Sequence, residues 1–169
     1  MPRLMALDVG AVRIGVALSD ASGFLASPYT TLRVTRDEAE TWAALQALIA
    51  ETEAEGLVVG LPISLDGQIH AQAERILAFA ERLKVHISLP VVFWDERLST
   101  VEAERLLAER GQKPRERRQS QGSRGGHKRK RRSSHEIDAL AAAVILQGYL
   151  DQHVQQRMSQ SNVIEDNAE

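Results

Sequence analysis

Three acidic positions stand at the ends of predicted secondary-structure elements. Asp8 follows the apolar run 4–7, the pair Asp95–Glu96 follows the apolar run "LPVVFW" (89–94), and Asp138 lies in the first turn of an alanine-rich helix. A buried carboxylate without a partner is costly, so each position needs a hydrogen-bond donor, a basic side chain or a cation. If the three converged, divalent cations between them would keep them ionised, and oxygen ligands suit Mg²⁺ or Mn²⁺.

Each of these acids also has a simpler explanation. Asp8 could accept hydrogen bonds from the turn that follows it, Asp95–Glu96 could pair with Arg97, and Asp138 could face the helix dipole. Because side chains alternate along a strand, Asp95 and Glu96 point to opposite faces if the strand continues through 96. Only one of the pair could then join a common site, and the spacing alone leaves both choices open.

The charges of the chain are strongly segregated. The 169 residues carry a net charge of −2, but residues 113–132 hold ten Lys or Arg against the single acid Glu116. This segment has a balance of +9 and the rest of the chain one of −11. The segment has no aromatic residues, so we expect it to contact phosphates rather than read bases; a solvated loop is the alternative.

Basic residues near the predicted acidic site are the candidates for contact with nucleic acid. Arg13 and Arg97 could hold phosphates or could instead bridge the acids. The densest part of the basic segment supplies the other candidates, which are Lys128, Arg129, Lys130, Arg131 and Arg132.

Apolar spacing predicts the elements that must position these residues. Two strands, at 4–7 and 14–18, form a hairpin, and a less regular third strand covers 24–34 around Pro28. A helix over 37–53, a buried strand over 56–62, a helix marked by Ala73 to Leu83 and a buried strand over 89–94 follow. A helix with a Ser99–Glu102 capping box ends at Gly111, and a last helix runs from about 135 to the mid-150s.

This order predicts an α/β fold with a mixed five-stranded sheet, antiparallel first and parallel later, flanked by helices. We expect one domain over 1–151, with a basic loop at 112–134 and a helix end and frayed tail at 152–169. Ala141, Ala142 and Ile145 share the helix face of Asp138. Their small size should let the helix approach the sheet and bring Asp138 to the carboxyl ends of the strands, where ligands usually bind.

Composition excludes several classes of site. The chain has no cysteine, so disulfides and thiolate metal sites are excluded, and its five histidines are too scattered to form a zinc set. The start lacks a secretory pattern, and the most apolar stretch, 137–150, is too short to span a bilayer. We therefore expect a cytoplasmic protein without a membrane partner.

Four stretches together resemble one protein family. They are "ALDVGAVRIGVALSD" (6–20), "VVGLPISLDG" (58–67), "DERLSTVEAERLL" (95–107) and "IDALAAAVILQGYL" (137–150). In this order they resemble the YqgF (RuvX) family, whose members are described as pre-16S ribosomal RNA nucleases and, earlier, as Holliday junction resolvases. The chain departs from the family pattern at Ser64, where Asn is expected, and in a longer, more Gly/Arg-rich stretch between Gly111 and Asp138.

The resemblance implies an RNase H-like fold and a role in 5′-end maturation of ribosomal RNA. It also implies that Asp8, Glu96 and Asp138 are catalytic and hold one or two Mg²⁺ or Mn²⁺ ions, which selects Glu96 over Asp95. The expected partner is nucleic acid, with pre-ribosomal RNA favoured over branched DNA, in a ribosome-assembly context; the oligomeric state stays open.

Two other functions fit parts of the sequence. The strand-turn-strand beginning "DVG" also resembles the phosphate hairpin of actin-like ATPases and sugar kinases, although those enzymes generally close two domains over ATP. A non-catalytic RNA-binding assembly factor would use the basic segment and leave the acids structural.

Overall fold

A computed structural model describes residues 1–62, 71–95 and 134–165, with 157–165 as helix backbone only. The described elements, in chain order, are β1 (Leu4–Val9), β2 (Arg13–Ser19), β3 (Ala26–Arg33), α1 (Glu38–Thr52), β4 (Gly56–Leu61), α2 (Ala71–His86), β5 (Val91–Asp95) and α4 (Ser134–Glu165). Within these residues, no helix is both long and apolar enough to cross a bilayer.

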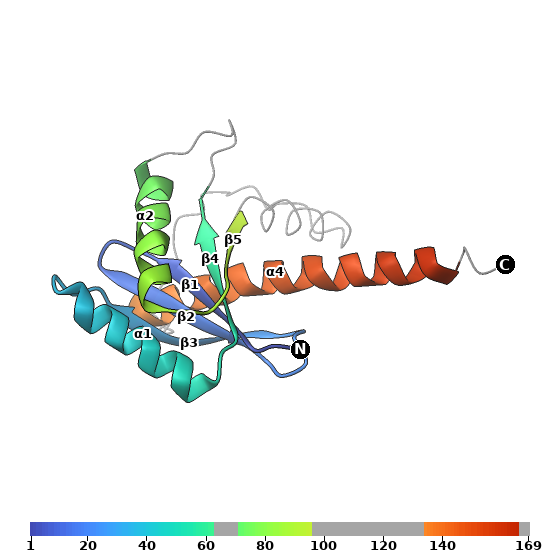
Figure 1. The fold of residues 1–169 in the computed structure, drawn as a ribbon, viewed down its shortest axis with the longest axis horizontal. Coiled ribbons are helices and arrows are strands. Elements are labelled where there is room, and N and C mark those ends of the chain that lie inside the picture. Colours follow the sequence, from blue (N-terminus) through green and yellow to red (C-terminus); the bar gives the residue numbers. More distant parts are fainter. Residues whose placement is uncertain (63–70, 96–133, 166–169) are drawn as a thin grey trace, which may run out of the picture.

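The five strands form one mixed sheet in the order β3-β2-β1-β4-β5 (Figure 1). β1 pairs antiparallel with β2 and parallel with β4, β2 pairs antiparallel with β3, and β4 pairs parallel with β5. The predicted mixed sheet is therefore confirmed. β3 is an edge strand, and its register with β2 shifts between Val16 and Ala17, next to Pro28, which has no N–H for the ladder.

Local signals explain where several elements begin and turn. Asp37 caps α1, because its carboxylate accepts a hydrogen bond from the Ala39 N–H at 3.0 Å. In the β1–β2 turn the Gly10 N–H donates to the Arg13 carbonyl at 2.9 Å. A Cβ at Gly10 would lie 2.7 Å from that carbonyl oxygen, so the tight turn needs glycine there.

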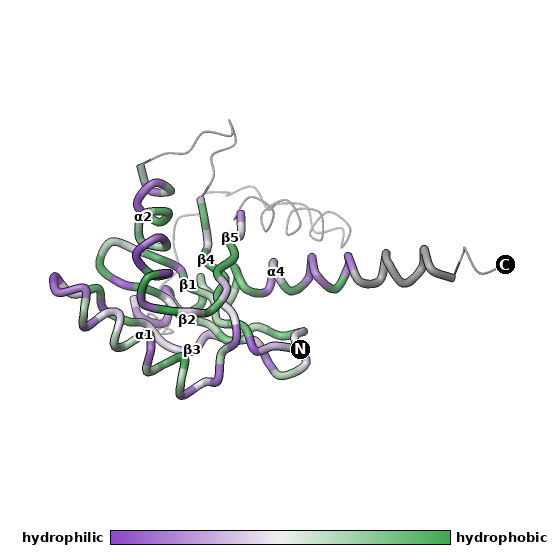
Figure 2. The backbone as a smooth tube through the Cα atoms, in the orientation of Figure 1, coloured by the Kyte–Doolittle hydropathy of each residue, from purple (hydrophilic) through white to green (hydrophobic). Residues whose placement is uncertain are grey.

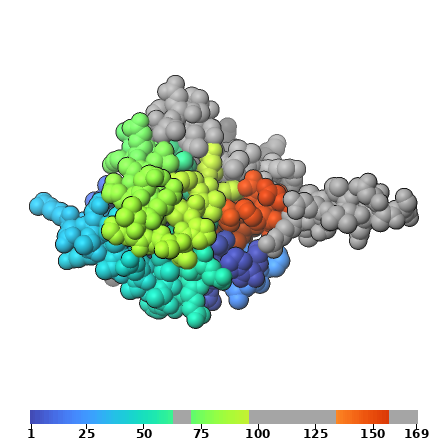
Figure 3. Space-filling model, viewed as in Figure 1, coloured from blue at the N-terminus to red at the C-terminus, as the bar shows by residue number. Residues whose placement is uncertain are grey.

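Helices cover both faces of the sheet (Figures 1 and 2). α1 and α2 lie side by side over one face, as the space-filling view also shows (Figure 3), and Trp42 of α1 contacts Phe79 of α2 with ring centroids 5.0 Å apart. α4 packs on the other face, where Ala142 and Leu146 are fully buried against Ala6. Trp42 and Trp94 are both buried, one on each side of the sheet.

The last helix is longer than its apolar pattern predicts. α4 continues to Glu165, well beyond the expected end in the mid-150s, because the Gln, Arg and Met residues that follow Leu150, the last buried residue among the side chains described to 156, are good helix formers. The side chain of Gln147 fixes this helix to the β2–β3 connection by accepting from the Ala26 N–H and donating to the Phe24 carbonyl, both at 2.9 Å. The predicted helix at Ser99–Gly111 and the basic loop lie outside the described residues.

Candidate active site

Asp8 lies near the carboxyl end of β1, the central strand of the sheet, on the face covered by α4. The alternation of β1 establishes this face, because Met5 and Leu7 belong to the core under α1 and α2 whereas Ala6 packs with α4. Asp8 continues the series of Ala6. The acid is thus placed at the α4 face by the same apolar pattern that buries its neighbours.

Gly15 allows the backbone of α4 to reach this position. Gly15 is the register partner of Asp8 on β2, and a Cβ at Gly15 would lie only 1.9 Å from the backbone oxygen of Asp138. Because α4 begins at Ser134, Asp138 lies in its second turn rather than in the predicted first turn, and this second turn rests directly on the backbone of β2. This contact brings Asp138 beside Asp8. The small residue that allows the approach at this point is Gly15 of the sheet, whereas the sequence pattern assigned it to Ala141, Ala142 and Ile145 of the helix.

A second contact holds the start of α4 at the edge of the sheet. The Thr31 hydroxyl of β3 donates to the carbonyl oxygen of His135 at 2.6 Å. His135 precedes Asp138 by three residues, so this hydrogen bond helps to fix the height of Asp138 above the sheet. Thr31 is the register partner of Gly15, which puts both anchoring positions in one row across β2 and β3.

Arg13 pairs with Asp138. The Arg13 Nε lies 2.5 Å from Asp138 Oδ2, and the two side chains are 37% and 24% exposed. Arg13 shares the α4 face with Gly15 and Ala17, because the three alternate along β2. The sequence suggested two roles for Arg13. The structure shows the ion pair with an acid, and contact with a phosphate stays a prediction.

Asp8 has no such compensation within the described residues, where neither a basic side chain nor a hydrogen-bond donor reaches its carboxylate. The simpler explanation of Asp8, as an acceptor for the following turn, therefore has no support. Burial, and then the negative charge of Asp138, raise the pKa of Asp8 above its ordinary value. A carboxylate in this position favours a cation as its partner.

The alternation of β5 separates Asp95 from this site. Val91 and Phe93 pack on the core under α1 and α2, and Trp94 packs on the α4 side with its ring edge toward Tyr149 at 5.9 Å. Asp95 therefore belongs to the face of Val91 and Phe93, opposite to that of Asp8. The sequence left open whether Asp95 or Glu96 joins Asp8, and the structure shows that Asp95 does not share the face of Asp8.

Several predicted site residues lie outside the described residues. These are Glu96, Arg97 and the basic residues Lys128, Arg129, Lys130, Arg131 and Arg132, together with Ser64. In the ranges 1–62, 71–95 and 134–165, no group of three His, Asp or Glu side chains forms a metal site. The structure thus brings together two of the three predicted acids, and the role of Glu96 stays a prediction.

The two described acids fit a divalent cation by their chemistry. They supply carboxylate oxygens, the ligands preferred by Mg²⁺ and Mn²⁺, and Asp8 carries a partly buried charge that no described group balances. Sequence reasoning did not identify the contribution of Gly15. Its signal was nonetheless present as the small Gly15 and Ala17 that alternate with larger apolar residues in "RIGVALS".

Comparison with known proteins identifies relatives over most of the chain. The family model of RuvX, described as Holliday junction resolvase, matches residues 2–152. A protein of Moorella thermoacetica named "Putative pre-16S rRNA nuclease" is 46% identical over 149 residues, which cover 88% of this chain and 94% of that one. A protein of the same name from Desulforamulus reducens is 45% identical over 150 residues, covering 88% of this chain and 96% of that one.

Solved structures support the fold. The structure of Thermus thermophilus RuvC in complex with a Holliday junction substrate matches with a TM-score of 0.52 and 16% identity, covering 90% of this chain and 97% of that one. This likeness places the sheet and its helices among RNase H-like folds. The family match over residues 2–152 and the relatives at 45–46% identity lead to one conclusion: the chain belongs to the RuvX (YqgF) family.

Proposed function

We propose that this protein is a metal-dependent nuclease that hydrolyses a phosphodiester bond during 5′-end maturation of pre-16S ribosomal RNA in the cytoplasm. One observation carries the proposal. Asp8, near the carboxyl end of β1, and Asp138, on α4, lie side by side, and no described group compensates the charge of Asp8. The chain matches two relatives over 94–96% of their length, and both are named for this activity, which supports RNA as the substrate.

In this proposal Asp8, Glu96 and Asp138 hold one or two Mg²⁺ or Mn²⁺ ions. When bound, these cations supply a water of lowered pKa for attack on phosphorus and stabilise the negative charge on the leaving 3′-oxygen. Asp8 would hold the cation from the sheet and Asp138 would hold it from α4. Glu96 is proposed as the third ligand because it directly follows β5, whose last residue, Asp95, belongs to the other face.

The basic residues would neutralise phosphates of the substrate next to the acids. Arg13 is held by Asp138 in the structure, so it is already beside the site at which a scissile phosphate would bind. Arg97 and the segment that contains Lys128 to Arg132 are proposed to grip the backbone on either side. The basic segment directly precedes the helix that carries Asp138 in the chain, which makes it the natural source of positive charge in an otherwise acidic protein.

A cleavage panel tests the proposal. Purified protein is given precursor 16S ribosomal RNA, generic single-stranded RNA and a four-way DNA junction, each with Mg²⁺, Mn²⁺ or EDTA. We expect cleavage of the precursor RNA with either metal and none with EDTA. Preferential cleavage of the junction would support the DNA nuclease suggested by the family description instead, and RNA binding that is unaffected by metal, without any product, would favour a non-catalytic assembly factor.

A further inference from the structure

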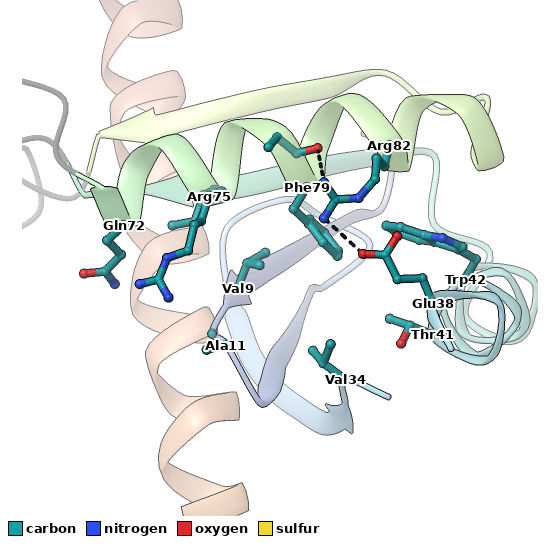
Figure 4. A pocket seen from close by; sticks show the side chains of 13 residues that line it. Val9, Ala11, Val34, Glu38, Thr41, Trp42, Gln72, Arg75, Phe79 and Arg82 are labelled. Atoms are coloured by element: carbon teal, nitrogen blue, oxygen red, sulfur yellow. Dashed lines mark hydrogen bonds and ion pairs between the residues drawn. The ribbon is translucent and has the colours of Figure 1, made fainter. Parts of the chain in front are cut away.

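A cavity of about 350 Å³ lies on the α1/α2 side of the sheet, beside the end of β1 (Figure 4). Its floor consists of buried apolar side chains, chiefly Trp42, Ile76 and Phe79. The β1–β2 turn forms one wall through Gly10 and Ala11. The volume falls within the range of small-molecule sites, roughly 300–1,000 Å³, and an apolar floor suits a flat ring.

The rim of the cavity offers one available positive charge. Arg82 is engaged, because its guanidinium contacts the Glu38 carboxylate at 3.1 Å and donates to the Ala78 carbonyl at 3.2 Å. Among the residues that the structure describes, no carboxylate pairs with Arg75. Figure 4 shows Arg75 beside Gln72 on α2, at the side of the cavity away from the Arg82–Glu38 pair. The cavity therefore combines an apolar floor with a guanidinium and an amide at its mouth.

The cavity is adjacent to the candidate active site through the chain itself. Val9, Gly10 and Ala11, which line it, directly follow Asp8. Three residues span at most about 10 Å, so the cavity lies within one or a few nucleotides of Asp8 along a strand that crosses the turn. Asp8 faces α4 and the cavity faces α2, which puts the β1–β2 turn between the two sites.

We propose that this cavity binds one unstacked nucleotide of the substrate strand, with its base on the apolar floor and its phosphate on Arg75, while a neighbouring phosphodiester lies at Asp8 and Asp138. This inference rests on the proposed function and names the substrate class more closely. A nucleotide enters such a cavity only if it leaves the base stack, which is cheapest in a single strand. The protein should therefore prefer single-stranded RNA over a duplex.

Binding measured in EDTA, where no strand is cut, tests this site separately from catalysis. The probe is a fluorescein-labelled single-stranded RNA of about 12 nucleotides, within the usual site size, and its blunt duplex is the comparison. Arg75→Gln should weaken single-strand binding about tenfold, as expected for loss of a charge-assisted hydrogen bond. It should also lower the slope of log affinity against log salt by about one.

Two matched variants separate a specific site from general electrostatics. Lys84→Gln removes the same charge from the far end of α2, where Lys84 pairs with Glu81, and should change affinity less than about twofold. Ala78→Trp places a large side chain in the cavity without changing charge, and should weaken single-strand binding about tenfold while leaving the salt slope unchanged. Val85→Trp, at an exposed position on the same helix, should have no effect.

Trp42 provides a direct signal, because it lines the cavity and the chain has only one other tryptophan. In a Trp94→Phe background whose fold is checked by circular dichroism, single-stranded RNA should change Trp42 fluorescence and the duplex should not. The proposal is overturned by an Ala78→Trp protein that binds as tightly as the parent, by equal effects of Arg75→Gln and Lys84→Gln, or by no single-strand binding at all. Saturation of the Trp42 signal by a free nucleoside monophosphate, without a response to the RNA, would also overturn it.

The outcomes keep this inference distinct from the proposed function. If the parent protein cleaves precursor RNA normally and the Arg75→Gln and Ala78→Trp variants bind RNA as tightly as the parent, only the proposed nucleotide site is disproved. If RNA binding depends on Arg75 and Ala78 as expected but no substrate is cut with any metal, only the proposed nuclease activity is disproved.

Discussion

The two faces of the sheet are built from different residues, and the candidate acids Asp8 and Asp138 lie on the face covered by α4. Under α1 and α2 the contacts are made by large apolar side chains such as Leu7, Ile14 and Trp42. Under α4 large side chains such as Leu146 and Leu150 are buried as well, but next to Asp8, Asp138 and Arg13 the helix meets the bare backbone of Gly15. Large side chains keep a helix away from a sheet and bury more area, whereas small ones let backbones approach. Both faces contribute apolar burial, and the α4 face also brings two carboxylates close together where Gly15 lets the helix reach the sheet.

The sharpest test of this comparison substitutes two neighbours on β1 that point to opposite faces. Asp8→Asn should reduce metal-dependent RNA cleavage by about a thousandfold or more, since a cation ligand contributes several kcal/mol to transition-state stabilisation. RNA binding and folding should remain. Leu7→Ala should instead cost about 2–5 kcal/mol of stability while the folded fraction still cleaves. Single-turnover cleavage and urea unfolding measure the two effects, and near-normal cleavage by Asp8→Asn would remove Asp8 from the mechanism.

The close approach of α4 is tested at Gly15. A methyl group there would lie 1.9 Å from the Asp138 backbone oxygen, so Gly15→Ala must move the start of α4 away from β2. We expect a loss of about 3 kcal/mol in the free energy of unfolding, at the upper end of overpacking effects, and loss of cleavage. Gly56→Ala is the matched control, because its added methyl meets the flexible end of Leu4 at 3.0 Å and otherwise only ordinary contacts with Pro90 at 3.9 Å. Equal stability of the two variants would show that α4 is not held against β2 in this way.

Arg13 treats the two acids differently, because its guanidinium neutralises the charge of Asp138 but does not reach Asp8. If a cation displaces the guanidinium from Asp138, Arg13→Gln should bind Mn²⁺ about tenfold more tightly than the parent, as measured by electron paramagnetic resonance of free Mn²⁺. Arg33→Gln removes the same charge at the register partner of Arg13 on β3 and should have a smaller effect. Weaker Mn²⁺ binding by Arg13→Gln would mean that Arg13 positions Asp138 for the ion.

The smallest expected effect concerns stability without metal. Because the pKa of Asp8 is raised, the native protein keeps this proton to a higher pH than the unfolded chain, and stability falls as pH rises between the two values. In EDTA at pH 7, Asp8→Asn should therefore be more stable than the parent, with Tm higher by about 2–4 °C for roughly 1 kcal/mol. This difference should shrink as the pH falls through the raised pKa and vanish below about 4. A calorimetric series that shows the difference growing toward acid would contradict the assignment.

Much of the fold could be predicted because it depends on local patterns. The period of apolar residues identified the hairpin, the two buried parallel strands and the helices, and Pro28 indicated the edge strand. The length of α4 could not be predicted from its apolar face, because the described side chains at 151–156 are not buried and intrinsic helix propensity has to carry the helix on from there.

The sequence by itself determined which residues are available: carboxylates placed after strands and at a helix start, small residues on one helix face, and the motifs of a family. Only the tertiary structure decided which of these residues meet. The separation of Asp95 from the face of Asp8, the choice of Asp138 as the partner of Arg13 and the need for glycine at 15 all depend on contacts between elements far apart in the chain. Such contacts depend on how closely two backbones pack, a distance that is set by side chains on both elements at once.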